Sequence, residues 1–558
     1  MSGEVEQIDK CLNIFDDFGK ASGAKINRDK TVGLAMNERV VFEKSTSNNV
    51  KLTLGPVKVL GVPAGKVKQM DFWEVIIQKI NKQLAIWKRR NLSLQGKVYV
   101  IRSLCISKIL FSTEYFNIND HIVNKLEKIL YEYLWDGKKN KVRKDVCVLP
   151  RKMGGLGMVD LRLALKVQKI KWIRRILCSD ENDEWAFHPI KCLKCLDKNF
   201  YVNFFTIRAY DTDKCLKNIN VNEFYISCVK TFQELCRKGR IKSNKDIIWC
   251  NTALKFNGDT LDWAHWAKSG LLYRHDIIKD FKINEQYIYE KLIYKANCYF
   301  DIAKLKASIP KDWLDVSDVS DNNNISTDEQ SCRKDILNTK FEIPGGSEKI
   351  FFDLTSKDIY NVLLLNKKTV IKSKDYWRNK FKNVQINFDL WYMCLLNCEI
   401  TPRKCIDFNW RILHGQVNTE TRLAKMKFSN GICRLCNIDL ENLDHLLFDC
   451  EHVKQLWDLI NQKFGNTCGF VCDRFTVIIG ILEETVDAKV CNMILSITRW
   501  LIWKRRNKFK FDDKFDDIDK LFVIVNLEIM KHIDILMRCN KIKKNKDIFK
   551  ILESIVKN

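Results

Sequence analysis

Apolar residues recur at steps of four between residues 72 and 84, at Phe72, Ile76, Ile80 and Leu84. This spacing places them on one face of a helix and predicts that this face is buried. The segment Trp87-Lys88-Arg89-Arg90 follows, and its cations suit the C-terminal end of that helix, where the helix dipole favours positive charge. The same periodicity predicts helices over 98–111, 122–135, 161–177, 453–464 and 493–503.

Strand signals are few by comparison. The clearest is the short apolar piece 58–63, which Gly61 and Pro63 limit. Residues 312–329 contain six acidic side chains, no basic ones and a run of asparagines, which is typical of a solvated linker. The pattern therefore predicts a mainly α-helical fold with several domains.

Composition supports a folded, multi-domain chain with an anionic partner. At 558 residues and 46% hydrophobic content, the sequence is long and apolar enough for three or four cores. Its 95 Lys and Arg against 69 Asp and Glu give a net charge of +26, which favours nucleic acid as a partner. A basic protein that is merely soluble remains the alternative, because charge alone does not distinguish the two.

The 22 cysteines are irregularly spaced, which favours metal binding over a disulfide framework. The first residues contain no apolar signal core, and no uncharged apolar run approaches 18 residues. We therefore expect an intracellular protein, cytoplasmic or nuclear or both, without a membrane span.

The candidate metal ligands are Cys433, Cys436, His445 and Cys450, in the spacing C-x2-C-x8-H-x4-C. Three thiols and one imidazole suit a tetrahedral Zn²⁺ with no open position, which is a structural role. The alternative is a set of buried core thiols, because apolar residues lie between them. In a continuous helix Cys450 would lie about 140° around from His445, so either the helix starts after His445 or His452 replaces it.

Six short segments are distinctive: residues 22–31 (SGAKINRDKT), 59–62 (VLGV), 92–98 (LSLQGKV), 149–157 (LPRKMGGLG), 408–415 (FNWRILHG) and 500–507 (WLIWKRRN). Taken in this order, they resemble landmarks of LINE-type (non-LTR) retrotransposon reverse transcriptases. The resemblance implies six regions, namely a palm remnant (1–65), a thumb-like helical domain (66–178), a helical middle region (179–311), the acidic linker (312–345), a zinc-binding segment (346–470) and a C-terminal helical region with a basic tail (471–558).

The resemblance also implies an RNA-directed DNA polymerase as the parent enzyme, whose carboxylates hold Mg²⁺ upstream of the segment at residue 22. Asp16 and Asp17 are close to that segment and fall in a helical pattern, where adjacent side chains point about 100° apart. We therefore expect no catalytic residue in this chain. Lys25 and Lys30, which would meet nucleotide phosphates in the intact enzyme, are expected to be surface cations here.

Clustered cations beside aromatic residues suggest where RNA or DNA would bind, because aromatics stack on bases while cations meet phosphates. The candidates are Lys88, Arg89, Arg90, Lys97, Lys138, Lys139, Lys141, Arg143, Lys144, Lys504, Arg505 and Arg506. A solvated helix end is the alternative for each cluster. The expected function is non-catalytic binding of template RNA and target DNA. An inactive, decayed element fragment and a host-adopted RNA-binding or chaperone protein are the alternatives, and the oligomeric state stays open.

Overall fold

The computed structural model describes residues 5–34, 50–138, 142–180, 183–196, 223–238, 254–257, 259–261, 265–266, 269–271, 274–280, 282–292, 298–309, 314, 333–334, 336–344, 346–365, 369–396, 398–465, 468–543 and 545–557. The chain divides into two compact units. Unit 1 combines 1–158 with 372–558, and unit 2 is the intervening stretch 159–371. The two halves of unit 1 are therefore distant in sequence. The six predicted region boundaries stay predictions.

Unit 1 begins with helix α1 (Val5–Ser22) and two small sheets. Strand β1 (Val32–Leu34) pairs in parallel with β2 (Lys51–Thr53), and β3 (Val57–Val59) pairs in antiparallel with β4 (Val62–Ala64). The segment predicted as one strand over 58–63 is thus a hairpin. Its turn consists of Leu60 and Gly61, whose φ angles are 49° and 85°.

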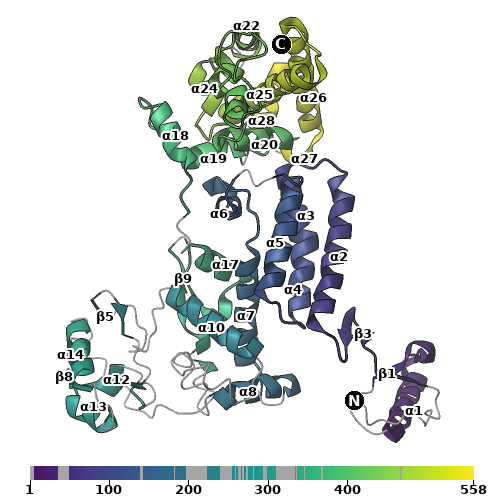
Figure 1. Cartoon of the computed structure of the whole chain (residues 1–558), viewed down its shortest axis with the longest axis vertical. Coiled ribbons are helices and arrows are strands. Elements are labelled where there is room, and N and C mark those ends of the chain that lie inside the picture. Colours follow the sequence, from purple (N-terminus) through teal and green to yellow (C-terminus); the bar gives the residue numbers. More distant parts are fainter. Residues whose placement is uncertain are drawn as a thin grey trace. The chain divides into compact units, whose positions relative to one another are not determined.

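A group of helices follows, and Figure 1 shows them side by side. The group consists of α2 (Gln69–Lys88), α3 (Leu94–Val100), the π-helical turn η2 (Ile101–Ile106), α4 (Ser107–Thr113) and α5 (Asp120–Leu134). Helix α2 buries Phe72, Ile76, Ile80 and Leu84, as the periodicity predicted. The short elements α6 (Lys144–Val148) and η3 (Arg151–Met153) complete this half of unit 1.

The C-terminal half of unit 1 is a helical bundle around the long helix α25 (Val486–Asp512). Fifteen residues of α25 are buried, and in the first half of the helix they lie on nearly all of its sides. The helix is so enclosed because three others pack against it, namely α20 (Arg403–Leu413), α26 (Ile518–Arg538) and α28 (Lys546–Lys557). The remaining helices are α18 (Ser373–Lys380), α19 (Phe388–Leu396), α21 (Glu420–Lys425), α22 (Glu451–Ile460), α24 (Arg474–Ile479) and α27 (Asn540–Lys543).

Polar contacts join the two halves of unit 1. The Asp407 carboxylate of α20 accepts a hydrogen bond from the backbone N–H of Leu94, 2.6 Å away at the start of α3. The carbonyl oxygen of Gly154 lies 3.0 Å from Trp410 Nε1 and 2.8 Å from His414 Nε2. Because these groups are buried, removing one partner of a hydrogen bond would leave the other unsatisfied and would lower the stability of unit 1.

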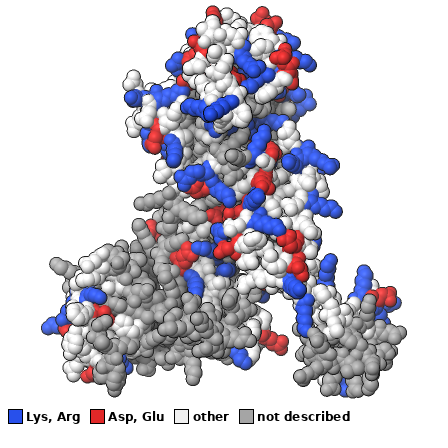
Figure 2. Space-filling view, viewed as in Figure 1, with Lys and Arg blue, Asp and Glu red and all other residues white. Residues whose placement is uncertain are grey.

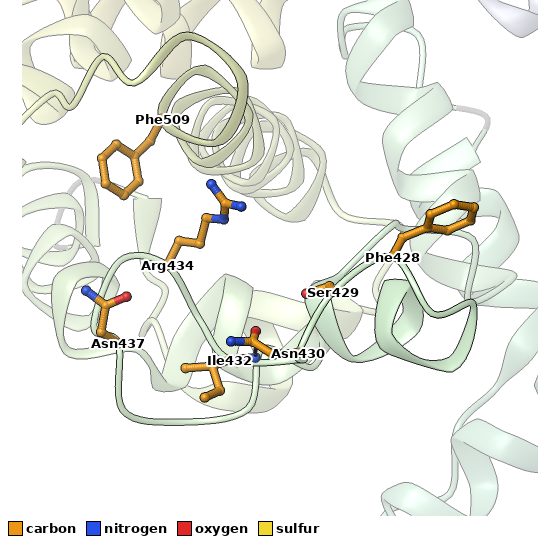
Figure 3. Close-up of a pocket in the computed structure, with 7 residues that line it drawn as sticks. All are labelled: Phe428, Ser429, Asn430, Ile432, Arg434, Asn437 and Phe509. Carbon is orange, nitrogen blue, oxygen red and sulfur yellow. Dashed lines mark hydrogen bonds between the residues drawn. The ribbon is translucent and has the colours of Figure 1, made fainter.

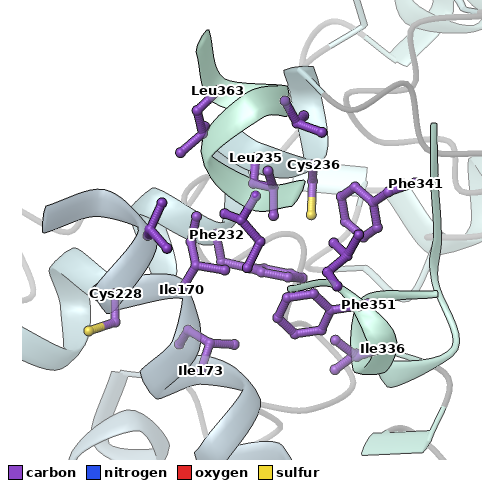
Figure 4. Packing of buried hydrophobic residues seen from close by; sticks show 14 of the residues in the cluster. Ile170, Ile173, Cys228, Phe232, Leu235, Cys236, Ile336, Phe341, Phe351 and Leu363 are labelled. Carbon is purple, nitrogen blue, oxygen red and sulfur yellow. The ribbon is translucent and has the colours of Figure 1, made fainter. Parts of the chain in front are cut away.

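Unit 2 contains two described hydrophobic clusters. The first joins α7 (Leu161–Leu177), α10 (Glu223–Lys238), α17 (Ser356–Leu365) and the strand β9 (Lys340–Glu342), with Phe232, Phe341 and Phe351 packed together (Figure 4). The second surrounds Trp266 and includes α13 (Glu285–Leu292) and α14 (Cys298–Ser308). Helix α7, which the sequence assigned to the thumb-like region, packs within unit 2.

The remaining described elements of unit 2 are α8 (Glu184–Leu196), β5 (Lys255–Phe256), β6 (Asp259–Thr260), α12 (Arg274–Ile277), β7 (Ile278–Lys279), β8 (Lys282–Ile283), β10 (Glu348–Ile350) and η5 (Phe351–Asp353). The described ranges confirm the prediction of a mainly α-helical, multi-domain fold. Apart from residue 314, the predicted acidic segment at 312–329 lies outside these ranges. None of the helices within them combines the length and apolar character that crossing a lipid bilayer requires.

Candidate metal centre and nucleic-acid surface

The first two candidate ligands lie in a tight hairpin, which we call the Cys/His hairpin (residues 431–441). Its two arms pair through the bridge between Ile432 and Leu440. The backbone N–H of Cys433 donates to the carbonyl of Asp439 (2.7 Å), and that of Asn437 donates to the carbonyl of Cys433 (2.8 Å). Asn437 has a φ of 56°, a left-handed conformation that Asn tolerates better than most residues. This turn places both thiols on one side.

The other two ligands flank a break between helices. His445 begins the π-helical turn η6 (His445–Asp449), and Cys450 has an extended backbone conformation at the start of α22. The N–H of Cys450 donates to the His445 carbonyl across 3.1 Å. The wide turn and the break bring both side chains to one place. This resolves the difficulty of a continuous helix without requiring His452 as a ligand.

The four ligand atoms of Cys433, Cys436, His445 and Cys450 all lie within 4.8 Å of one another. Cys436 Sγ and His445 Nε2 are 3.4 Å apart. Tetrahedral Zn²⁺ with bonds of about 2.0–2.3 Å needs ligand separations of roughly 3.3–3.8 Å, so only small movements are required. The donor set and its spacing therefore fit a four-coordinate zinc ion.

The electrostatics of the cluster also favour a cation. A hydrogen bond from Cys450 lowers the pKa of the Cys433 thiol well below its ordinary value, and that bond raises the pKa of Cys450. A metal ion binds thiolates, so it would take the place of the proton that the two thiols share. Nδ1 of His445 lies 3.8 Å from a carboxylate oxygen of Asp439, on the ring side opposite the ligand nitrogen, where metal-bound histidines commonly have a carboxylate.

A buried network of ion pairs joins the Cys/His hairpin to helices α21 and α25. Arg506 of α25 contacts the carboxylates of Glu441 at 2.5 Å and Glu420 at 2.7 Å, and Lys510 contacts Glu420 at 2.6 Å. Ser429 also donates to Glu420. Arg506, Glu420 and Glu441 are almost completely buried, so the network links α21, the hairpin and α25 as one structure.

These positions correct part of the predicted nucleic-acid surface. Arg506 is committed to the network, Arg505 is buried and donates to the Asp516 carbonyl, and Lys97 is buried against Asp136. A buried, paired cation cannot meet phosphates, so the structure removes these three from the candidate interface. Lys139 and Lys141 lie outside the described residues.

The remaining predicted cations are at the surface. Lys88, Arg89 and Arg90 are exposed at the end of α2, and the Arg90 guanidinium lies 4.8 Å from the centre of the Trp87 ring. Lys138 and Lys504 are also exposed. Arg143 and Lys144 are exposed but already paired with Asp145 and Glu127. Figure 2 shows Lys and Arg side chains over the α2–α5 helices and over the C-terminal helices, with carboxylates among them.

Two groups of polar side chains were missed by sequence reasoning. At the junction of α3, η3 and α20, Arg403 donates to Gln95 (3.2 Å), and burial lowers the pKa of the nearby Arg151 guanidinium, with Arg403 adding like charge. In the Cys/His hairpin, Arg434 and Asn437 face a cavity. The first group has no local signal in the sequence, because folding brings its distant members together, and the second is hidden within the Cys motif, where only the cavity reveals it.

Comparison with known proteins agrees with the sequence motifs. A family model described as zinc-binding in reverse transcriptase matches residues 387–457, the stretch that contains all four ligand residues. The chain is 22% identical over 519 residues to the Transposon TX1 uncharacterized 149 kDa protein of Xenopus laevis. That alignment covers 83% of this chain and 37% of the relative, so the chain spans well under half of the relative's length. Both findings confirm the resemblance to proteins derived from LINE-type reverse transcriptases.

Proposed function

We propose that this chain is a nucleic-acid-binding, non-catalytic part of a LINE-type reverse transcriptase, stabilised by one structural Zn²⁺. The observation that carries the proposal is the convergence of Cys433, Cys436, His445 and Cys450 within the segment that matches the reverse-transcriptase zinc-binding family. With four protein ligands the ion has no open position for water or substrate, so its role is to hold the fold.

Binding of template RNA and target DNA is supported by charge and exposure. The chain carries a net charge of +26, and the exposed cations Lys88, Arg89 and Arg90 adjoin Trp87 at the end of α2. Such cations contact phosphates without reading sequence, and each contact releases counterions. The expected binding is therefore steeply dependent on salt.

The non-catalytic character is supported by the surroundings of Asp16 and Asp17. Both lie on helix α1, where Asp17 pairs with Lys20 at 2.8 Å and Asp16 pairs with Arg28. Two exposed carboxylates that point in different directions and already have cationic partners do not form a two-metal site. Mg²⁺ would act only in the intact parent enzyme, which supplies the other carboxylates.

The test measures metal content and binding on the full chain. We expect about one Zn²⁺ per chain, lost in Cys450→Ser but retained in Cys539→Ser, a matched change at an exposed thiol. Binding of an RNA–DNA duplex should weaken steeply as salt rises, and a chelator should unfold the C-terminal half of unit 1 because zinc sites contribute roughly 10–16 kcal/mol to folding.

Two results would contradict the proposal. Retention of the fold and of binding after complete metal removal would refute the structural zinc ion. Primer extension by the purified chain with Mg²⁺, tested in parallel on the same duplex, would refute the non-catalytic assignment and direct attention back to Asp16 and Asp17.

A further inference from the structure

A cavity of about 540 Å³ adjoins the Cys/His hairpin. It lies between the hairpin, the preceding residues 428–430 and the end of α25, and Phe428, Asn430, Arg434, Asn437 and Phe509 are among the residues that line it (Figure 3). The volume falls within the range typical of small-ligand sites. The cavity lies next to the proposed metal ligands Cys433 and Cys436, since the lining residues Arg434 and Asn437 directly follow them in sequence.

Aromatic rings stand at the two ends of the cavity. Phe428 is 78% exposed, so its ring contributes little to the core. Phe509 is half-buried and held edge-on by Phe515, with ring centres 5.4 Å apart. In Figure 3, Phe509 lies on the same side as Arg434 and Asn437, and Phe428 lies at the opposite end. Exposed rings beside cations are a common arrangement for stacking on unpaired bases.

The polar groups of the cavity are available for a ligand. Within the described ranges, the Arg434 guanidinium and the Asn437 side-chain amide have no protein partner, and both residues are exposed. The side-chain oxygen Oδ1 of Asn430 accepts a hydrogen bond from the backbone N–H of Ile432 at 3.1 Å. A guanidinium suits a phosphate, and amides suit the donor and acceptor edge of a base.

We propose that this cavity binds one unpaired nucleotide of a single-stranded nucleic acid, with its base against Phe428 and its phosphate at Arg434. The inference rests on the proposed nucleic-acid-binding function and deepens it, because the duplex surface at α2 has no role in base contact. A base inside a duplex is stacked and paired, so it cannot present its face to Phe428. The net charge of the chain favours a polyanion over an acidic or apolar peptide.

The test compares full-length variants by fluorescence anisotropy with a labelled 12-nucleotide single-stranded RNA, the same sequence as DNA, and its blunt duplex. Phe428→Ala and Arg434→Gln are expected to weaken single-strand binding by about fivefold or more, with less than a twofold change for the duplex. The matched controls are Phe511→Ala, an exposed ring outside the cavity, and Arg538→Gln, an exposed arginine on α26. Circular dichroism and zinc content verify that each variant is folded.

A second readout maps the contact directly. An oligonucleotide carrying one 5-iodouridine should photo-crosslink to Phe428 or Phe509, and the crosslink should disappear in Phe428→Ala with Phe509→Leu. The RNA and DNA arms show which sugar the site accepts, and efficient binding of either supports the proposal.

Several outcomes would overturn the inference. Three results of these experiments would refute the nucleotide site: unchanged single-strand affinity in both cavity variants, equal losses of affinity for single strand and duplex, or crosslinks confined to other residues. Displacement of the labelled single strand by an acidic peptide but not by an unlabelled oligonucleotide would refute it too. Each of these results leaves the proposed function standing. Failure of the unaltered chain to bind any of the three nucleic acids would refute both.

Discussion

At the scale of single residues, His414 and Asp407 lie at the junction of the two halves of unit 1 and have pKa values shifted toward the neutral form. Burial lowers the pKa of His414 to about 4, although its hydrogen bond to the Gly154 carbonyl opposes the shift. Burial raises the pKa of Asp407 to about 6, against the hydrogen bond from the Leu94 N–H. Both groups are therefore held neutral more readily than in water.

These shifts predict opposite pH dependences. His414 binds its proton more weakly in the folded chain, so its contribution to stability is present above about pH 6.5 and is lost as pH falls toward 4. Asp407 binds its proton more tightly when folded, so it contributes below about pH 4 and that contribution is lost as pH rises through about 6. Between pH 7 and 5 the two effects partly cancel.

Substitution should separate them. Relative to the unaltered chain, His414→Gln should lose less free energy of unfolding between pH 7 and 5, by about 2 kcal/mol, and Asp407→Asn should lose more, by about 1 kcal/mol. Denaturant unfolding of both variants at the two pH values measures this. Parallel pH profiles for all three proteins would show that neither group titrates as its burial implies.

A second prediction concerns Arg506. Arg506→Met should lower the free energy of unfolding of unit 1 by about 3–5 kcal/mol, because the buried carboxylates of Glu420 and Glu441 would lose their shared cation. Arg538→Met provides the control, since Arg538 forms an exposed pair with Asp534 that is worth about 1 kcal/mol or less. Equal unfolding midpoints for the two variants would contradict a stabilising role for the network.

The repeated segment Trp-Lys-Arg-Arg-Asn shows what the sequence can and cannot predict for a residue. At 87–91 it ends α2 and its cations are exposed, whereas at 503–507 it lies inside α25 and two of its cations are buried. Local sequence is the same, but the carboxylates that pair with Arg506 are 65 and 86 residues away. The four candidate metal ligands, by contrast, lie together as their spacing suggested, because that spacing is itself what a tetrahedral ion requires.

At the scale of elements, the exposed cations at the end of α2 lead to a further prediction. Lys88→Gln, Arg89→Gln and Arg90→Gln together should weaken duplex binding and reduce the slope of log affinity against log salt by up to about 3, since each lost phosphate contact removes about 0.9. The matched control replaces three exposed lysines of the C-terminal helices, Lys531, Lys546 and Lys550. The same change in slope for both triple variants would show that only net charge matters.

Helix periodicity predicted elements better than it predicted their interruptions. Helix α7 has the predicted bounds, 161–177, because its apolar residues repeat regularly. The hairpin at 57–64 and the π-helical turn at His445 were not predicted. The hairpin depends on the positive φ angles of Leu60 and Gly61, whereas the π-helical turn ends in an extended backbone at Cys450, and neither feature alters the apolar periodicity.

At the scale of the whole molecule, unit 1 contains two stretches that the sequence treats as separate domains. We expect residues 1–158 and 372–558, produced as two chains in one cell, to co-purify, because the contacts at Gly154, Asp407 and Trp410 are buried between them. Residues 372–558 produced alone should unfold at a lower temperature than the co-purified pair, since Trp410 and His414 would be exposed. An unchanged melting temperature for that fragment would contradict this view of unit 1.

The bond between His414 and Gly154 joins residues 260 positions apart, which has a consequence for synthesis on the ribosome. At roughly 5–20 residues per second, translation needs about 13–50 s to pass from one partner to the other. During that delay α3 and η3 emerge without α20 and α19, which pack against them in the folded chain, and unit 2 is completed first. The nascent chain therefore presents uncovered apolar surface for tens of seconds, a period in which a chaperone would protect it from aggregation.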